Sequence, residues 1–283
     1  MNRAMRRAIK AAFVNFKGGV GKTTTCQQAA HRVAKRGRRV LVVEADPQGN
    51  MTLAMSNFID DPGQPELRPP CSLADVLDRR SSATITDAIV HTHREGFDLV
   101  PGGFKELQAV SDQLISQMGA ENSLKTALEP VMDQYDYIFF DCRPATDLIT
   151  RNAMVAADCA VIVTEPLAWG NHGAREALGT VDDMRHFLSV DLPVAGFVVN
   201  KYQSSRLDQA GHLEWLQEVS ADQGIPILGL PIPLFTEISR LAENGLGLDE
   251  HPKETAKMRV IAETYDAVID AIGATAANEG VHA

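Results

Sequence analysis

Short apolar runs alternate along the chain with longer segments whose apolar residues recur at helical spacing. Residues 9–16, 38–46 and 135–141 are such runs, and their near-continuous apolar character is typical of parallel strands covered on both faces. Between the first two runs, residues 22–36 predict a helix that ends with Gly37 at its C′ position. Strand, glycine-rich loop and helix therefore form the opening unit of the chain.

The same alternation continues toward the C-terminus. Further strands are predicted at 97–102, 159–165, 193–201 and 226–232, and further helices at 72–77, 105–118, 122–133, 148–156, 172–188 and 206–223, with two more helices after residue 232. Alternation of this kind is typical of an α/β fold with a doubly wound, mostly parallel sheet, whose ligand site lies at the carboxyl ends of the strands. Residues 1–283 are expected to form a single domain.

Three segments are expected to lie outside this regular framework. Residues 1–8 predict a basic N-terminal arm. Residues 59–71, rich in proline, glycine and acidic residues, predict an irregular surface excursion, after which Ser72 is expected to cap a short helix. Residues 273–283, mostly alanine, glycine and polar residues, are expected to fray.

Charge and composition narrow the function further. The formal net charge of −10 argues against a surface built throughout for polyphosphate, so any contact with DNA must be local. The four cysteines form no CxxC pair, which fits a reducing cytoplasm better than a zinc site or a disulfide framework. The apolar run after the basic start is too short for a signal peptide or a membrane span.

A glycine-rich loop directly after the first strand carries the clearest chemistry. It comprises Lys17, Gly18, Gly19, Val20, Gly21, Lys22, Thr23 and Thr24. Small residues let backbone N–H groups surround phosphates, and the helix that follows adds positive potential at its N-terminus. Lys22 is expected to reach the β- and γ-phosphates, and the Thr23 hydroxyl to bind Mg²⁺. The ordinary P-loop pattern fails because Phe16 stands where its first glycine belongs; the deviant form, opened by Lys17, matches instead.

Two aspartates end predicted strands. Asp46 follows the strand within 38–46, and Asp141 closes the run at 135–141. Either one alone is compatible with a helix cap or a turn. Together, at strand ends that follow a P-loop, they indicate the phosphate and metal site of a nucleotide-binding sheet.

With these motifs the sequence resembles the ParA/MinD-type deviant Walker ATPases, specifically their ParA branch, over most of its length. KGGVGKTTT resembles the family's P-loop, EADPQGN at 44–50 its second motif, and YDYIFFD at 135–141 its Walker B strand. Asn200 is similar to the adenine-reading position. The segment that begins at Pro231 resembles the late loop and helix, which places both residues among the expected nucleotide contacts.

The resemblance implies an Mg²⁺-dependent ATPase that forms an ATP-dependent homodimer with two nucleotides between its subunits. Lys17 would cross to the partner's ATP. Asp46 would orient the attacking water, and Asp141 would hold a Mg²⁺-bound water, which makes Thr23, Asp46 and Asp141 the expected metal site. The implied cofactors are ATP and Mg²⁺.

The same resemblance implies a role in plasmid or chromosome partition, or in positioning a cargo, with nonspecific DNA binding and a ParB-like or adaptor protein that stimulates hydrolysis. The protein would be cytoplasmic and associated with the nucleoid when ATP-bound. Arg206 and Arg240 are the candidate DNA contacts. Leu234 and Glu237, however, stand where DNA-contacting members carry arginines, which leaves DNA binding open. The acidic face of the C-terminal helix argues against membrane targeting.

Alternatives remain at this point. The chain could be a nucleotide-gated adaptor that binds a protein and not DNA, or a metabolic P-loop enzyme related to dethiobiotin synthetase. Arg143, two residues after Asp141 where the family usually has proline, is either a solvated loop residue or a charge near the γ-phosphate. Trp169 is either a packing residue or an exposed partner contact.

Overall fold

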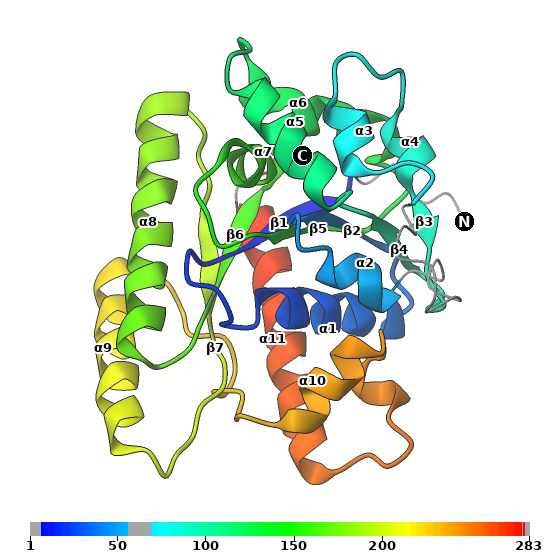
Figure 1. Cartoon of the computed structure of the whole chain (residues 1–283). Helices are drawn as coiled ribbons and strands as arrows, with labels where there is room; N and C mark the ends of the chain where they lie inside the picture. Colours follow the sequence, from blue (N-terminus) through cyan, green and yellow to red (C-terminus); the bar gives the residue numbers. More distant parts are fainter. Residues whose placement is uncertain (1–6, 56–68, 279, 281–283) are drawn as a thin grey trace.

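A mostly parallel sheet forms the centre of the molecule (Figure 1). The computed structural model describes residues 7–55, 69–278 and 280. Within these residues the sheet has the order β3-β4-β2-β5-β1-β6-β7, and only the β3–β4 pair is antiparallel. The strands are β1 (Ile9–Val14), β2 (Val40–Ala45), β3 (Val90–His91), β4 (Phe97–Val100), β5 (Tyr137–Cys142), β6 (Cys159–Thr164) and β7 (Val194–Val199).

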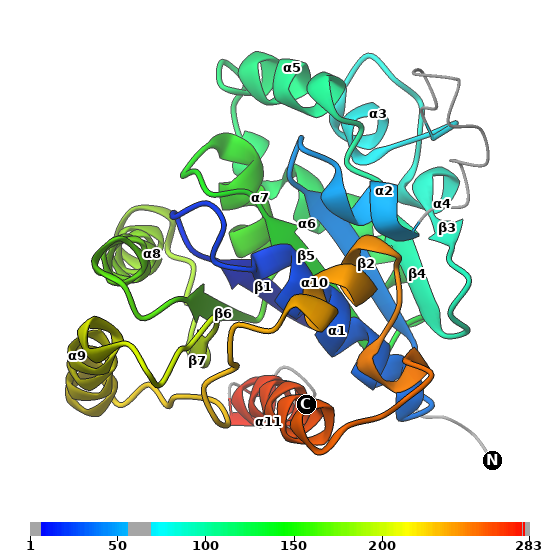
Figure 2. The same ribbon diagram turned by 60° about the horizontal axis from the view of Figure 1, so that its bottom comes forward.

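Helices cover both faces of this sheet, which confirms the predicted doubly wound α/β fold (Figures 1 and 2). They are α1 (Lys22–Lys35), α2 (Asn50–Met55), α3 (Leu73–Leu77), α4 (Ile85–Ala88), α5 (Lys105–Leu114), α6 (Ser123–Leu128), α7 (Leu148–Ala156), α8 (Ala168–Leu188), α9 (Leu207–Gln223), α10 (Thr236–Glu243) and α11 (Ala256–Asn278). Short 3₁₀ turns are η1 (Ala120–Asn122), η2 (Glu129–Val131) and η3 (Leu248–Glu250).

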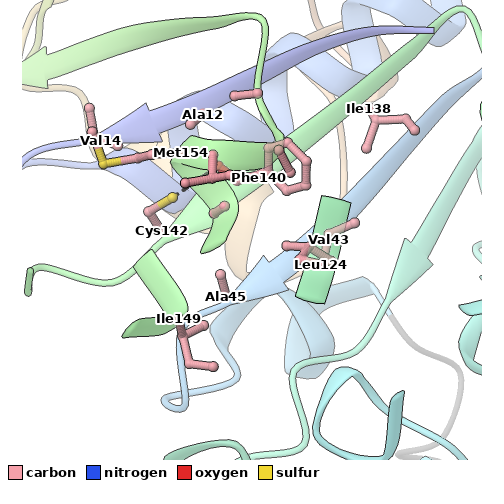
Figure 3. Close-up of a cluster of buried hydrophobic side chains, with 14 of the residues drawn as sticks. Ala12, Val14, Val43, Ala45, Leu124, Ile138, Phe140, Cys142, Ile149 and Met154 are labelled. Carbon is pink, nitrogen blue, oxygen red and sulfur yellow. Dashed lines mark hydrogen bonds between the residues drawn. The ribbon is translucent and has the colours of Figure 1, made fainter. Parts of the chain in front are cut away.

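The hydrophobic core has two layers because successive side chains of a strand point to opposite faces. Ala12 of β1 and Phe140 of β5 pack on the side of α6 and α7, in the cluster shown in Figure 3. Their neighbours Phe13 and Phe139 pack on the other side with α1 and α11, and their rings meet edge to face at 5.3 Å. Apolar residues on both faces explain why these strands read as continuous apolar runs.

The prediction of a strand at 226–232 is wrong. The segment follows the edge strand β7 through a few backbone hydrogen bonds, such as Leu228 N–H to the Phe197 carbonyl and Ile232 N–H to the Val199 carbonyl, both 2.8 Å. The two donors are four positions apart in sequence but the two acceptors only two, because the chain loops outward at Gly229, whose φ is 64°. The prolines of this segment also lack an N–H to donate to a ladder.

Other boundaries also differ from the predictions. Residues 273–278 do not fray: they continue α11, since Ile272 and Ala276 extend its buried stripe. The helix predicted at 122–133 is broken into η1, α6 and η2, with Pro130 in the last turn. Helix α8 begins four residues before the predicted position 172. The predicted cap is confirmed, because Ser72 forms a capping box with Asp75. The predictions for residues 1–6 and 59–68 lie outside the described residues, whereas Ala8 is buried.

Candidate functional site

The P-loop connects β1 to α1 at the carboxyl edge of the sheet (Figure 2). Gly19 and Gly21 adopt left-handed φ angles of 81° and 94°, which side chains other than glycine rarely tolerate. A Cβ atom on Gly21 would also lie 2.1 Å from the side-chain nitrogen of Asn200. The glycines predicted from the motif are therefore required both by the backbone and by a neighbour that is remote in sequence.

A cavity of about 410 Å³ opens in front of this loop, a size that suits a small ligand. Of the residues predicted from the sequence, it is lined by Gly18, Gly19, Gly21, Lys22, Thr23, Thr24, Asp46 and Asn200. It is also lined by Gln48, Asn50, Pro144, Lys201, Pro233, Leu234, Phe235, Ile238 and Ser239, which the sequence analysis did not assign to the site. Val20, by contrast, is fully buried beneath the loop.

Lys22 is the buried cation of the cavity. Its ammonium group donates a hydrogen bond to the Lys17 carbonyl at 3.2 Å. Burial lowers the pKa of Lys22, and the nearby carboxylate of Asp141 counteracts this effect. An anion in the cavity would restore a charged partner to this lysine, as expected for a phosphate-binding residue.

Asp141 ends β5 close to Lys22 and Thr23. Its carboxylate is buried, and neither oxygen has a hydrogen-bond partner of good geometry among the described residues. Burial raises the pKa of Asp141 to about 8, and the nearby carboxylates of Glu44 and Asp46 add to the increase, while Thr23 and Lys22 oppose it. A buried carboxylate with unused acceptor positions, next to a threonine hydroxyl, fits a hydrated divalent cation such as Mg²⁺.

Asp46 follows β2 and faces the cavity. One of its carboxylate oxygens accepts a hydrogen bond from the Gln48 N–H at 3.0 Å, which turns the chain toward α2. The other predicted catalytic residue, Lys17, does not line the cavity, although its carbonyl accepts the hydrogen bond from Lys22. Its backbone N–H donates to the Asn15 side chain at 2.7 Å, and its side chain is half-buried.

Glu44 is a residue of the site that sequence reasoning missed. It is fully buried and accepts hydrogen bonds from the backbone N–H groups of Met51 at 2.7 Å and Gly102 at 3.1 Å, and from the hydroxyl of Thr52. Burial raises the pKa of Glu44, and these hydrogen bonds oppose the increase. Glu44 thereby fixes the start of α2, and with it the loop that carries Asp46. The sequence did contain a signal for this role, because Glu44 is the one acidic residue within the apolar strand β2.

Asn200 and Lys201 hold the P-loop from the side of β7. The Asn200 side chain donates to the Val20 carbonyl at 2.9 Å, and the Lys201 ammonium group donates to the Gly19 carbonyl. Lys201 has a φ of 56°, a strained conformation for a residue with a side chain. Strain of this kind is frequent at functional sites, and the structure makes Lys201 part of the cavity wall.

Pro231 does not line the cavity, and Pro233 does. The chain passes β7 at Ile232, whose carbonyl accepts a hydrogen bond from Tyr202 N–H at 2.9 Å, and only then turns toward the nucleotide side. Pro231, predicted as a nucleotide contact, therefore lies two residues before the part of this loop that lines the cavity.

Arg143 matches neither of its two predicted environments. It is half-buried and does not line the cavity. Its guanidinium group donates to the side chain of Gln108 on α5 and pairs with Asp147 at 2.8 Å. The next residue, Pro144, reaches the cavity wall. Arg143 thus ties the loop after β5 to its surroundings on the side away from the P-loop.

The two candidate DNA contacts are exposed and already paired. Arg206 pairs with Asp208 at 2.5 Å, and Arg240 pairs with Glu237 at 3.3 Å. Their segments are adjacent, since Leu234 N–H donates to the Tyr202 carbonyl at 3.0 Å. The described residues include no helix long and apolar enough to cross a membrane.

A P-loop with a buried lysine, facing carboxylates at two strand ends, defines a nucleotide-binding site of the P-loop class. A family model described as an AAA domain matches residues 8–194. The chromosome partitioning protein ParA of Caulobacter vibrioides is 33% identical over 238 residues, which are 83% of this chain and 84% of that protein. An uncharacterised protein of Mycobacterium tuberculosis is 34% identical over 191 residues, 68% of this chain but only 57% of that longer protein.

Solved structures share the fold of this chain. McdA from Cyanothece superposes with a TM-score of 0.79 at 22% identity, over 94% of this chain and 100% of McdA, which supports the fold. A structure named as cobyrinic acid a,c-diamide synthase from Mycobacterium smegmatis, with a bound ATP analogue and magnesium, has a TM-score of 0.74 and 26% identity over 93% of this chain and 94% of that one. The chain belongs to the ParA/MinD superfamily of partition ATPases, a class that uses ATP and Mg²⁺.

Proposed function

We propose that this protein is an ATP-dependent dimerisation switch with a slow, Mg²⁺-dependent ATPase activity, acting in DNA partition or cargo positioning. The observation that carries the proposal is the different placement of two lysines on one loop. Lys22 is buried and lines the cavity, whereas Lys17 is half-buried and does not line it, and within the described residues its ammonium group forms no ion pair. A cation in that position is available to a nucleotide held by a second subunit.

Nucleotide binding follows from the cavity itself. Phosphate oxygens would accept hydrogen bonds from P-loop N–H groups at the start of α1 and face the ammonium group of Lys22. Pro233 and Phe235 offer apolar surface for the base on the opposite wall. Mg²⁺, held by the Thr23 hydroxyl and through water by Asp141, would neutralise phosphate charge.

Hydrolysis then requires an oriented water, a task we assign to Asp46. The water oxygen bonds to the γ-phosphorus while the bond from that phosphorus to the bridging oxygen breaks, which yields ADP and phosphate. The proton released by the water passes to the phosphate product. Lys17 of the opposing subunit would stabilise the charge on the transferring group, so that hydrolysis depends on dimerisation.

Sedimentation velocity with Mg-ATP tests this mechanism. Wild type is expected to dimerise and then to return to monomer as ATP is consumed. Lys17→Ala is expected to bind ATP without forming a stable dimer, because it lacks the cation that crosses the interface. Asp46→Ala is expected to remain dimeric, because it closes but cannot hydrolyse. A Lys17→Ala variant that dimerises and turns over like wild type would remove the proposal.

DNA binding and the stimulating partner belong to the same proposal. ParA of C. vibrioides is a chromosome partitioning protein, which supports an analogous role here with a ParB-like or adaptor partner. The DNA contacts would include Arg206 and Arg240. Dimerisation would double this small patch on one face, so that DNA affinity follows nucleotide state despite the net charge of −10.

A second candidate is a nucleotide-gated adaptor that binds protein and not DNA. The pairing of Arg206 with Asp208 and of Arg240 with Glu237 favours it, because both arginines are partly neutralised already. Gel shifts across a salt series with ATP, ADP and no nucleotide separate the candidates. The first predicts ATP-dependent binding that weakens with salt and is lost in the double variant Arg206→Glu, Arg240→Glu. An absence of ATP-dependent binding at low salt would favour the adaptor.

A further inference from the structure

Trp169 stands in the first turn of α8 with 70% of its surface exposed. The other tryptophan, Trp215 on α9, packs against the core beneath the guanidinium group of Arg175, 5.1 Å from the ring centroid. Indole is a large, mostly apolar group that folded proteins seldom leave in water without a reason, and it is enriched at interfaces. The structure therefore excludes the packing role for Trp169.

Two glycines let the start of α8 pack closely against its neighbours, and one of them, Gly173, packs against the P-loop. A Cβ atom on Gly173 would lie 2.1 Å from the Asn15 side-chain oxygen and 2.8 Å from the backbone nitrogen of Lys17. A Cβ atom on Gly170 would lie 2.2 Å from the Glu165 carbonyl oxygen. Only glycine lets α8 approach so closely, and both views show its ribbon next to the loop between β1 and α1 (Figures 1 and 2). The contact of α8 with Lys17 thus lies one helical turn after Trp169.

We propose that Trp169 is an intersubunit contact, which packs onto a second copy of this chain when two ATP-loaded subunits close over their cavities. This inference rests on the proposed function. If Lys17 reaches a nucleotide in the opposing subunit, that subunit must also approach Trp169, which lies one helical turn before the contact of α8 with Lys17. The occupant of this surface is therefore a second copy.

The surface around the cavity supports this choice of occupant. Leu234, on the cavity wall, and Leu53, on α2 beside Thr23 and Thr24, are each 51% exposed. Apolar side chains therefore border the P-loop region from α8, from α2 and from the loop before α10. In a two-fold dimer each subunit contributes the same patch, so one set of apolar residues is buried twice. The fixed backbone at Trp169 means that little order must be gained on contact.

The two tryptophans give a direct measurement. In a Trp215→Phe background Trp169 is the sole tryptophan, and Asp46→Ala keeps the ATP state from turning over. Mg-ATP is expected to shift the emission of Trp169 to shorter wavelength, with the same dependence on protein concentration as dimer formation measured by sedimentation. Mg-ADP is expected to leave the emission unchanged, as is Mg-ATP when Lys17→Ala is added.

A substitution provides the second arm. Trp169→Ala in the Asp46→Ala protein is expected to raise the dissociation constant of the ATP dimer by about tenfold or more, while Trp215→Phe leaves it within about twofold. The inference is overturned if the Asp46→Ala protein dimerises with ATP, the emission of Trp169 does not change, and the added Trp169→Ala substitution does not weaken the dimer. That result would leave the proposed ATP-dependent dimerisation intact. An emission change that is independent of protein concentration also overturns the inference. If the Asp46→Ala protein does not dimerise with ATP, both the role of Trp169 and the proposed dimerisation switch are refuted.

Discussion

The carboxyl ends of β1, β2 and β5 differ from the loop and helix around Arg206 and α10 in how their charges are satisfied. At the strand ends, Asp141 is buried without a hydrogen-bond partner of good geometry among the described residues, and Lys22 is buried with a carbonyl as its hydrogen-bond acceptor. Around α10, Arg240 is exposed and already paired with a carboxylate of its own helix. The first region thus has buried charged groups that can bind a ligand, whereas the second has exposed charges that neutralise each other.

This difference has an energetic cause. Burying a charge without a partner costs several kcal/mol, and such groups cluster at functional sites. An exposed ion pair contributes about 0–1 kcal/mol and can be broken or rebuilt at little cost. Substitutions at the strand ends should therefore have large effects, and substitutions on the second surface small ones.

The largest effect is expected from the P-loop. Lys22→Ala removes the buried charge that faces the phosphates, and Thr23→Ala removes a Mg²⁺ ligand. Each is expected to weaken Mg-ATP binding by about 100-fold or more, as for loss of one partner of a buried charge pair. Calorimetric titration measures this. Unchanged affinity in both variants would refute the P-loop assignment.

Asp141→Asn is expected to separate stability from function. The native pKa of Asp141 is about 8, above its ordinary value of 3.8, so its contribution to stability is present below pH 4 and is lost as the pH rises toward 8. Removing the charge should raise the apoprotein's free energy of unfolding at pH 8 by about 1–3 kcal/mol and abolish stabilisation by Mg-ATP. Thermal melts at pH 5 and pH 8 test this; a less stable apoprotein at pH 8 would contradict it.

Lys201→Met should have an intermediate effect, because Lys201 holds the P-loop from outside. We expect ATP affinity to fall by about tenfold, as for loss of a hydrogen bond to a charged group. Lys253→Met is the matched control, since this exposed lysine does not line the cavity. Equal affinities in the two variants would mean that the contact with Gly19 does not order the loop.

Glu237→Arg should have the smallest effect on the fold. It breaks an exposed pair with Arg240, which changes stability by less than about 0.5 kcal/mol. It should strengthen ATP-dependent DNA binding. The slope of the logarithm of the binding constant against the logarithm of the salt concentration should become more negative by about 0.9 for each added phosphate contact. Gel shifts at several salt concentrations measure the slope, and an unchanged slope would place Glu237 away from DNA.

How far the sequence predicted this structure depended on the range of the interactions. The P-loop glycines were predictable, because their φ angles are a local requirement. So were the central strands, whose residues are apolar on both faces. Lys201 was not predicted, because its contact with Gly19 joins residues 182 positions apart. The environment of Arg143, in the loop after β5, was missed for the same reason, since Gln108 lies on α5, 35 positions earlier in the sequence.

Apolar composition alone was also misleading. The run at 226–232 looked like a strand, but Gly229 and the flanking prolines prevent a regular ladder with β7. Pro231, predicted as a nucleotide contact, does not line the cavity, whereas Pro233 does. At the C-terminus, by contrast, small residues after Ile272 suggested fraying, although Ala276 is fully buried within α11.

The central claim is that Lys17 acts on the nucleotide of the opposing subunit, and mixing two inactive variants tests it most directly. Lys17→Ala retains Asp46 in its own site, and Asp46→Ala retains Lys17. If they are mixed equally before Mg-ATP is added, the mixed dimer contains one complete site, with Asp46 from one subunit and Lys17 from the other. Random pairing would give about one quarter of wild-type ATPase activity, and recovery above the separate variants but below this value is expected because Lys17→Ala weakens dimerisation. No recovery above the separate variants would contradict the account, because it would mean that Lys17 acts within its own subunit.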